Sequence, residues 1–213
     1  MRHASALALL TLTLAASCTT RTELVTSWAA PGASKASVKK VLVLGISQDN
    51  GIRRRFEDDF ASRLIGRGFQ AIAGYQWVPD ASKLDKDALV QRIRAEGVTH
   101  VLVTRLVGKK TVTTDVPTTV TTVGYAPYGP GYYGGWGTYW SVGYGTVVSP
   151  GYTTVNDVVT LETNFYDASK GDKDALVWTG QTETWMDDGG GTQQKIDSVI
   201  SKVVYEMRAK GII

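Results

Sequence analysis

Residues 39–73 read KKVLVLGISQDNGIRRRFEDDFASRLIGRGFQAIA, and they predict a strand, a helix and a second strand in direct succession. Residues 39–46 are apolar after their two lysines, which is typical of a strand that is buried on both faces. Gly66 and Gly68 end the helix, and residues 69–73 give the second strand. The helix itself is predicted from apolar residues at every fourth position: Ile52, Phe56, Phe60 and Leu64.

The rest of the chain continues this alternation and then changes to strands. A second helix is expected over residues 86–96 with Asp85 as its cap, followed by a third apolar strand over residues 98–107. Two more strands, 157–166 and 175–185, precede a final helix. We therefore expect an α/β (α+β) fold: a single β-α-β-α-β-β-β-α domain with a mixed sheet, helices packed on it, and a long Gly/Tyr-rich protruding hairpin or loop.

The final helix has the clearest amphipathic pattern in the chain, and Thr192 is the candidate residue for its cap. A helix of this kind is stabilised by docking on a sheet. We expect the sheet face to be the one that carries Val41, Val43, Val101 and Val103. The apolar stripe consists of Ile196, Val199, Ile200, Val203, Val204 and Met207. The residues expected off the stripe are Lys195, Asp197, Ser198, Lys202 and Glu206.

Composition and charge indicate an ordinary globular domain with no affinity for nucleic acid. Apolar residues make up 43% of the chain, charged residues 20%, and the formal net charge is only +3. Binding to nucleic acid needs a clustered basic surface, so this class of partner is not expected. The tightest basic run, residues 53–55, is followed directly by three acidic residues at 57–59. On a helix these charges can pair, so we predict a solvated, self-compensated face.

The first eighteen residues have the pattern of an export signal that ends in a lipidation site. Arg2 precedes the uncharged Leu/Ala-rich run 4–16, which is too short to span a bilayer. Residues 1–17 are predicted to be a signal peptide. Cys18, the only cysteine, is predicted to be acylated on its sulfur, with palmitate as the expected fatty acid. The sequence before Cys18 resembles the bacterial lipobox, although Ala15 stands where that pattern prefers Leu. Thr19 replaces the Asp that marks inner-membrane retention, so the outer membrane is expected.

The mature chain divides into three parts by composition. Residues 18–37 are predicted to be the lipidated cysteine and a tether, in which residues 23–28 are apolar enough to add an edge strand. Residues 38–213 form the single domain. Within it, residues 124–152 are a low-complexity insertion with nine Gly, seven Tyr and no charge. This insertion is interpreted either as a loose hairpin without a role or as an aromatic contact surface, for which the candidate residues are Tyr125, Tyr128, Tyr132, Tyr133, Trp136, Tyr139, Trp140 and Tyr144.

The sequence contains few of the residues that common enzyme sites require. After the signal peptide one histidine is left, His100, which is predicted to be a strand-end residue with a satisfied hydrogen bond rather than a metal ligand or a catalytic base. The glycines of residues 129–134 match a dinucleotide fingerprint only by composition, since no helix is predicted after them. No cofactor and no metal are expected. A hydrolase site made of two dispersed carboxylates stays an open alternative, because the two residues of such a pair can be distant in sequence.

Several segments together resemble a family of uncharacterised proteobacterial envelope lipoproteins. The segments are 24–28, 40–47, 54–58, 101–106 and the predicted hairpin strands that contain Tyr166-Asp167 and Leu176-Val177-Trp178. More remotely, the opening strand-helix-strand is similar to the TolB amino-terminal domain and to the CsgG lipoprotein. The resemblance implies an α/β domain that contacts envelope proteins, and it implies no activity.

These observations predict a non-enzymatic, periplasm-facing outer-membrane lipoprotein that is a structural or protein-interaction module of the cell envelope. It would attach to the membrane through its amino-terminal lipid. The first alternative is a glycan- or peptidoglycan-binding module that uses the aromatic insertion as a stacking platform. The second is a hydrolase with dispersed carboxylates.

Overall fold

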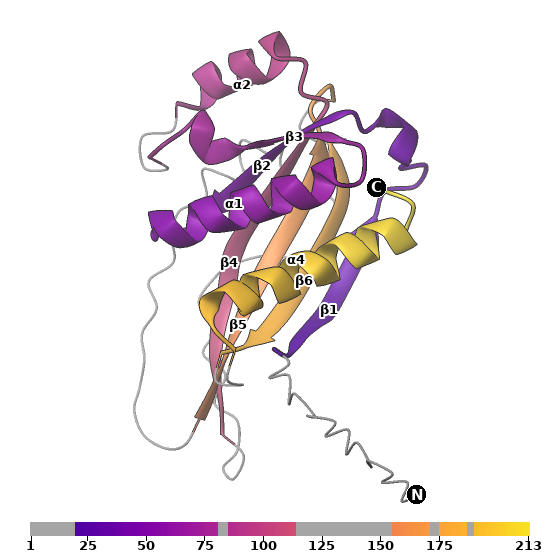
Figure 1. Cartoon of the computed structure of the whole chain (residues 1–213). Coiled ribbons are helices and arrows are strands. Elements are labelled where there is room, and N and C mark those ends of the chain that lie inside the picture. Colours follow the sequence, from indigo (N-terminus) through magenta and orange to yellow (C-terminus); the bar gives the residue numbers. More distant parts are fainter. Residues whose placement is uncertain (1–19, 81–84, 114–154, 171–174, 187–189) are drawn as a thin grey trace, which may run out of the picture.

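The computed structural model describes residues 20–80, 85–113, 155–170, 175–186 and 190–213. These residues form one six-stranded mixed sheet with helices on both of its faces (Figure 1). The strands are β1 (Thr22–Ala29), β2 (Lys40–Ile46), β3 (Gln70–Ala73), β4 (His100–Thr113), β5 (Val155–Asp167) and β6 (Leu176–Trp185). The helices are α1 (Asn50–Ile65), α2 (Lys86–Ala95) and α4 (Thr192–Ala209), with short 3-10 turns η1 (Lys35–Ser37) and η2 (Gly74–Gln76). From β2 onward, this order confirms the predicted fold class.

The strand order in the sheet is β1-β6-β5-β4-β2-β3. β2 is parallel to both β3 and β4, whereas β4, β5, β6 and β1 pair antiparallel. The chain therefore leaves β2 for β3 on one side and returns to β4 on the other side. β2 is thus the strand at which the order reverses. In open α/β sheets, pockets form beyond the carboxyl ends of the strands at such a point.

Two apolar clusters cover the two faces of the sheet. α1 and α4 lie side by side on one face (Figure 1), where Val41, Val43, Leu102 and Trp178 meet the helices. Leu42, Leu44, Val101 and Val103 lie on the opposite face, in the cluster that contains Leu89 and Ile93 of α2. The prediction that Val101 and Val103 underlie the final helix is therefore wrong. Successive side chains of a strand point to opposite faces, so β4 contributes Leu102 to the side of α4.

An edge strand forms within the stretch that was predicted as a tether. Residues 22–29 are β1, which pairs antiparallel with β6 from Thr22 opposite Thr184 to Ala29 opposite Trp178. After β1, the backbone N–H of Lys35 donates to the Gly211 carbonyl at 3.0 Å. The described residues that precede β2 are therefore held against the sheet at several points.

The ends of the helices follow local capping rules. Asp85 accepts the backbone N–H of Ala88 at 3.1 Å and caps α2 as predicted. Asp49 caps α1 in the same way through Gly51 and Ile52. The prediction of a Thr192 cap for α4 is wrong, because Thr192 is the first helical residue and Gly191 precedes it. The Gly191 N–H donates to the side chain of Gln194 at 3.0 Å, which satisfies one of the free donors at this end.

The acidic and basic residues of α1 do not all lie in solvent, so the prediction of a solvated charged face is wrong in part. Arg53 is 1% exposed and Glu57 is fully buried, whereas Arg54, Arg55 and Asp58 are exposed. Arg53 and Glu57 are four residues apart and form a buried ion pair next to Gly45 of β2. Lys195 of α4, which was expected off the apolar stripe, is also buried.

Candidate functional site

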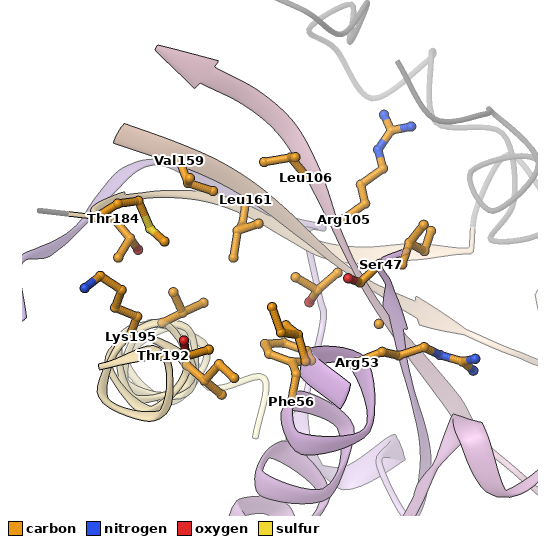
Figure 2. A pocket seen from close by; sticks show the side chains of 17 residues that line it. Ser47, Arg53, Phe56, Arg105, Leu106, Val159, Leu161, Thr184, Thr192 and Lys195 are labelled. Carbon is orange, nitrogen blue, oxygen red and sulfur yellow. The ribbon is translucent and has the colours of Figure 1, made fainter. Parts of the chain in front are cut away.

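A groove opens between the first turns of α1 and α4, at the carboxyl end of β2 and beside the middle of the neighbouring strand β4 (Figure 2). Its volume is about 270 Å³. This is the position that the reversal of strand order at β2 favours for a ligand site. The lining comes from six elements and their flanks: Gly45 and Ile46 of β2 and Ser47 after it; Ile52, Arg53 and Phe56 of α1; Thr104, Arg105 and Leu106 of β4; Val159 and Leu161 of β5; Thr184 of β6 and Met186 after it; and Thr192, Lys195, Ile196 and Val199 of α4.

The groove has an exposed apolar rim. Ile52 is 42% exposed, Leu106 is 47% exposed and Met186 is 40% exposed. Among the described residues six large apolar side chains are exposed, and these three surround one opening. A cluster of exposed apolar side chains around a concave surface is typical of a binding site, whereas single ones are ordinary.

Most of the polar groups that line the groove are engaged with the protein itself. The Lys195 ammonium donates to the Gly190 carbonyl. The hydroxyl groups of Thr104 and Thr163 lie 2.9 Å apart, and those of Thr184 and Thr22 lie 3.0 Å apart. In Figure 2, Leu161 and Phe56 point into the groove, whereas the guanidinium groups of Arg53 and Arg105 point away from it. The surface that remains for a ligand is therefore mainly apolar.

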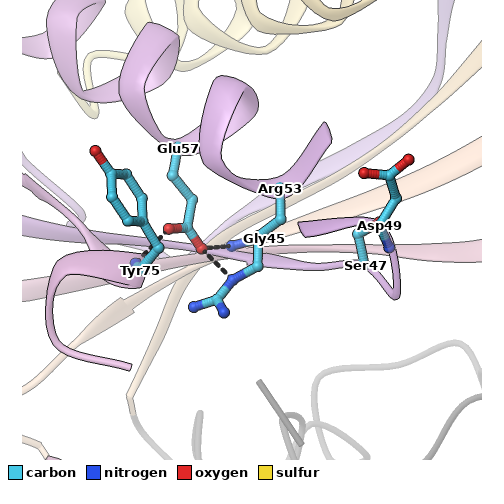
Figure 3. A network of polar contacts seen from close by, with 6 residues as sticks. All are labelled: Gly45, Ser47, Asp49, Arg53, Glu57 and Tyr75. Atoms are coloured by element: carbon cyan, nitrogen blue, oxygen red, sulfur yellow. Dashed lines mark hydrogen bonds and ion pairs between the residues drawn. The ribbon is translucent and has the colours of Figure 1, made fainter. Parts of the chain in front are cut away.

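A buried carboxylate fixes one wall of the groove (Figure 3). Oε1 of Glu57 accepts the Gly45 N–H at 2.8 Å and Nε of Arg53 at 3.0 Å, and Oε2 accepts the Tyr75 N–H at 2.5 Å. Burial raises the pKa of Glu57, and the hydrogen bonds from Gly45, Arg53 and Tyr75 oppose that rise. Because Glu57 joins β2, α1 and η2, it positions the lining residues Gly45 and Arg53.

Glu57 is the partner that compensates the charge of Arg53. Nη1 and Nη2 of Arg53 are buried and have no hydrogen-bond partner among the described residues. Nε is therefore the one guanidinium nitrogen with a hydrogen bond, and it donates to Glu57. The pair is structural, since the guanidinium points away from the groove (Figure 2).

His100 belongs to the core and not to the groove. Its ring stacks on Phe165 with centroids 4.9 Å apart, and Nδ1 lies 3.1 Å from the Thr99 hydroxyl. The predicted hydrogen bond is present at this nitrogen, whereas Nε2 is buried without a partner among the described residues. Within the described ranges, no three residues of the types His, Cys, Asp and Glu gather in a group that could hold a metal ion.

The burial of His100 predicts a dependence of stability on pH. Burial lowers the pKa of His100 below its ordinary value, so the unfolded chain binds the proton more readily. The free energy of unfolding should therefore fall as the pH decreases from about 7 to about 5. Urea titrations of the wild type and of His100→Gln at these pH values measure this. The variant should have the weaker pH dependence, and equal dependence in both proteins would show that His100 does not cause it.

Two sets of sequence-predicted residues lie outside the described residues. The first is Cys18, and the second is the group of eight aromatic residues between 125 and 144. Lipidation and aromatic contacts therefore stay predictions. Within the described part of the chain, no helix is long and apolar enough to cross a membrane.

The groove itself was not predicted. Ile52 was assigned to the buried stripe of α1, but it stands exposed at the rim because the first turn of α1 extends past the end of β2. The signal that could have located it is the β-α-β-α-β start, since a sheet of this kind carries pockets at the carboxyl ends of its parallel strands.

Three solved structures of bacterial proteins are similar to this chain at low sequence identity. The PelC dodecamer from Paraburkholderia phytofirmans is 14% identical, with a TM-score of 0.45, over 86% of this chain and 95% of that chain. Lipoprotein GNA1162 from Neisseria meningitidis is 12% identical, with a TM-score of 0.39, over 80% and 99%. A DUF4136 family protein from Bacteroides thetaiotaomicron is 13% identical, with a TM-score of 0.39, over 91% and 97%. No protein-family model and no curated protein matches the sequence.

Proposed function

We propose that this chain is a lipid-anchored protein of the cell envelope that acts as a binding module and not as an enzyme. Its binding site is the groove between α1 and α4. The observation that carries the proposal is the exposed apolar rim formed by Ile52, Leu106 and Met186 around an opening at the strand-order reversal. The lining supports binding rather than catalysis, because its lysine and two of its threonines are already hydrogen-bonded within the protein.

The anchor is proposed from the first eighteen residues. The uncharged run 4–16 ends in small residues before Cys18, which is the only cysteine of the chain. The outer membrane and its periplasmic side are part of this proposal, on the ground that Thr19 follows Cys18.

Growth of a bacterial host with labelled palmitate tests the anchor. The wild-type protein should incorporate the label, and Cys18→Ala should abolish it, because the cysteine sulfur carries the lipid. Labelling of both proteins to the same extent would contradict lipidation at Cys18.

Titration with the apolar fluorescent probe N-phenyl-1-naphthylamine tests the groove as the binding site. The chain with Cys18→Ala is used without detergent, so that no detergent competes for the groove. Ile52→Arg should weaken binding by about tenfold, which corresponds to about 1.4 kcal/mol, because it places a charge at the apolar rim. The measurement is the Kd of the probe from its fluorescence.

Ile65→Arg is the matched control. Ile65 is also an exposed isoleucine of α1, at 55%, but it lies at the other end of the helix and does not line the groove. This variant should bind the probe as the parent does. If the two variants weaken binding equally, or if the parent does not bind the probe, the groove is not the binding site.

A further inference from the structure

We infer that the groove accepts an acyl chain of a lipid from the same membrane to which Cys18 anchors the protein. This inference deepens the proposed function and rests on it, since it requires both the lipid anchor and the groove as the binding site. The evidence for it is the position of Thr20, the first described residue, beside the elements that form the groove.

The first described residue, Thr20, is held against the start of α4. Ser198 of α4 donates a hydrogen bond to the Thr20 carbonyl at 3.5 Å. Thr20 also lies against Gly190, because a Cβ atom added to this glycine would clash with the Thr20 hydroxyl. The next residue, Arg21, accepts the backbone N–H of Trp185 through its carbonyl at 3.0 Å. Thr20 and Arg21 are thus fixed between the end of β6 and the start of α4.

The same two elements form one side of the groove. Thr184 and Met186 line it from the end of β6, and Thr192 and Lys195 line it from the first turn of α4. The link is direct at two points. First, the Lys195 ammonium donates to the carbonyl of Gly190, the residue beside Thr20. Second, the hydroxyl groups of Thr184 and Thr22 lie 3.0 Å apart. In Figure 1, the starts of β1 and α4 lie at the same end of the sheet.

The distance from this point to the lipid is short. One residue, Thr19, separates Cys18 from Thr20. Two residues of extended chain span about 7 Å at most. When the acyl chains of Cys18 lie in the bilayer, the groove is therefore held at the membrane surface, and the exposed side chains of its rim face the boundary between headgroups and acyl chains.

The charges around the groove favour an acyl chain over an anionic headgroup as the recognised part of the lipid. Lys109 is paired with Asp157 at 2.6 Å, and Lys110 is paired with Glu183 at 2.7 Å. Both lysines lie on β4 beyond Leu106. Arg105, which precedes Leu106 and lines the groove, has its Nη2 3.8 Å from Oε1 of Glu162, so the cations of that strand are already compensated. What the groove offers is apolar area, which a lipid tail can bury.

Quenching of a fluorophore at the rim by nitroxide-labelled lipid tests the inference. Cys18 is the only cysteine, and acylation blocks its thiol, so an introduced cysteine can be labelled selectively in the full lipidated chain. Leu106→Cys carries an NBD fluorophore, and the protein is reconstituted into phosphatidylcholine vesicles. A fraction of the lipid bears a nitroxide on its acyl chain. The expected result is strong loss of NBD fluorescence at position 106.

Ile65→Cys is the control in the same vesicles. It is exposed like Leu106 but lies away from the groove, so its fluorescence should not be quenched. Both positions are exposed in the native protein, and a circular dichroism spectrum equal to that of the wild type verifies the fold of each variant. Equal quenching at both positions overturns the inference, because the membrane then covers the domain without preference for the groove.

An unquenched fluorophore at position 106 also overturns the inference. If Ile52→Arg nevertheless weakens binding of N-phenyl-1-naphthylamine, the proposed binding site stands, and its occupant is an apolar segment of a protein. If the probe does not bind and palmitate does not label Cys18, the proposed function itself fails. The two failures are therefore distinguishable.

Discussion

Ile200→Ala should lower the free energy of unfolding by roughly 2–5 kcal/mol, a large part of the stability of a domain of this size. Ile200 lies in the middle of the apolar stripe of α4 and is fully buried in the cluster that joins α1, α4 and the sheet. Truncation to alanine removes the side-chain contacts and leaves a cavity that its tightly packed neighbours fill only in part. Urea titration of the two proteins gives the difference.

The matched control for this prediction is Lys202→Ala. Lys202 lies two residues further along the same helix and is only half-buried, off the stripe. Its replacement should cost less than about 0.5 kcal/mol. If Ile200→Ala unfolds at the same urea concentration as the wild type, α4 does not belong to the core.

Glu57→Ala should lower the free energy of unfolding by about 3–5 kcal/mol, which is typical when one partner of a buried ion pair is removed. Nε of Arg53 would lose its acceptor, and the guanidinium would remain buried without a compensating charge. The backbone N–H groups of Gly45 and Tyr75 would also lose their acceptor. Each effect destabilises the junction of β2, α1 and η2.

Two further variants separate these contributions. Asp58→Ala changes the neighbouring acid, which is exposed and lies 3.3 Å from the Tyr75 hydroxyl, and it should have a small effect. Arg53→Met combined with Glu57→Ala removes the uncompensated charge, so it should recover part of the loss. A Glu57→Ala variant that is no less stable than Asp58→Ala would contradict the structural role of the buried pair.

The elements that could be predicted from the sequence are those whose signal is local. The apolar run of β2, the stripe of α4 and the Asp85 cap of α2 each depend on residues within a few positions of one another. The face on which β4 meets α4 could not be predicted in this way. It depends on the strand register, and a shift of one residue exchanges Leu102 for Val101 or Val103.

The candidate site could not be predicted because its residues are joined only by the tertiary structure. Arg53 and Glu57 have the spacing of an exposed helical ion pair. Their buried network is completed by the backbone N–H groups of Gly45 in β2 and of Tyr75, which lies 18 residues after Glu57. Likewise, Ile52, Leu106 and Met186 come from three separate segments. No local pattern relates them, whereas the sheet order places them around one opening.

The position of a bound apolar probe shows whether the groove between α1 and α4 is the binding site. Methyl NMR of the Cys18→Ala chain, labelled at Ile, Leu and Val, can detect nuclear Overhauser effects from N-phenyl-1-naphthylamine to individual methyl groups. We expect such effects at Leu106, Val159 and Leu161, which line the groove, and none at Val25 or Ile65, which are exposed elsewhere. Effects confined to Val25 and Ile65, or a probe that leaves the methyl groups of the groove unchanged, would contradict this expectation.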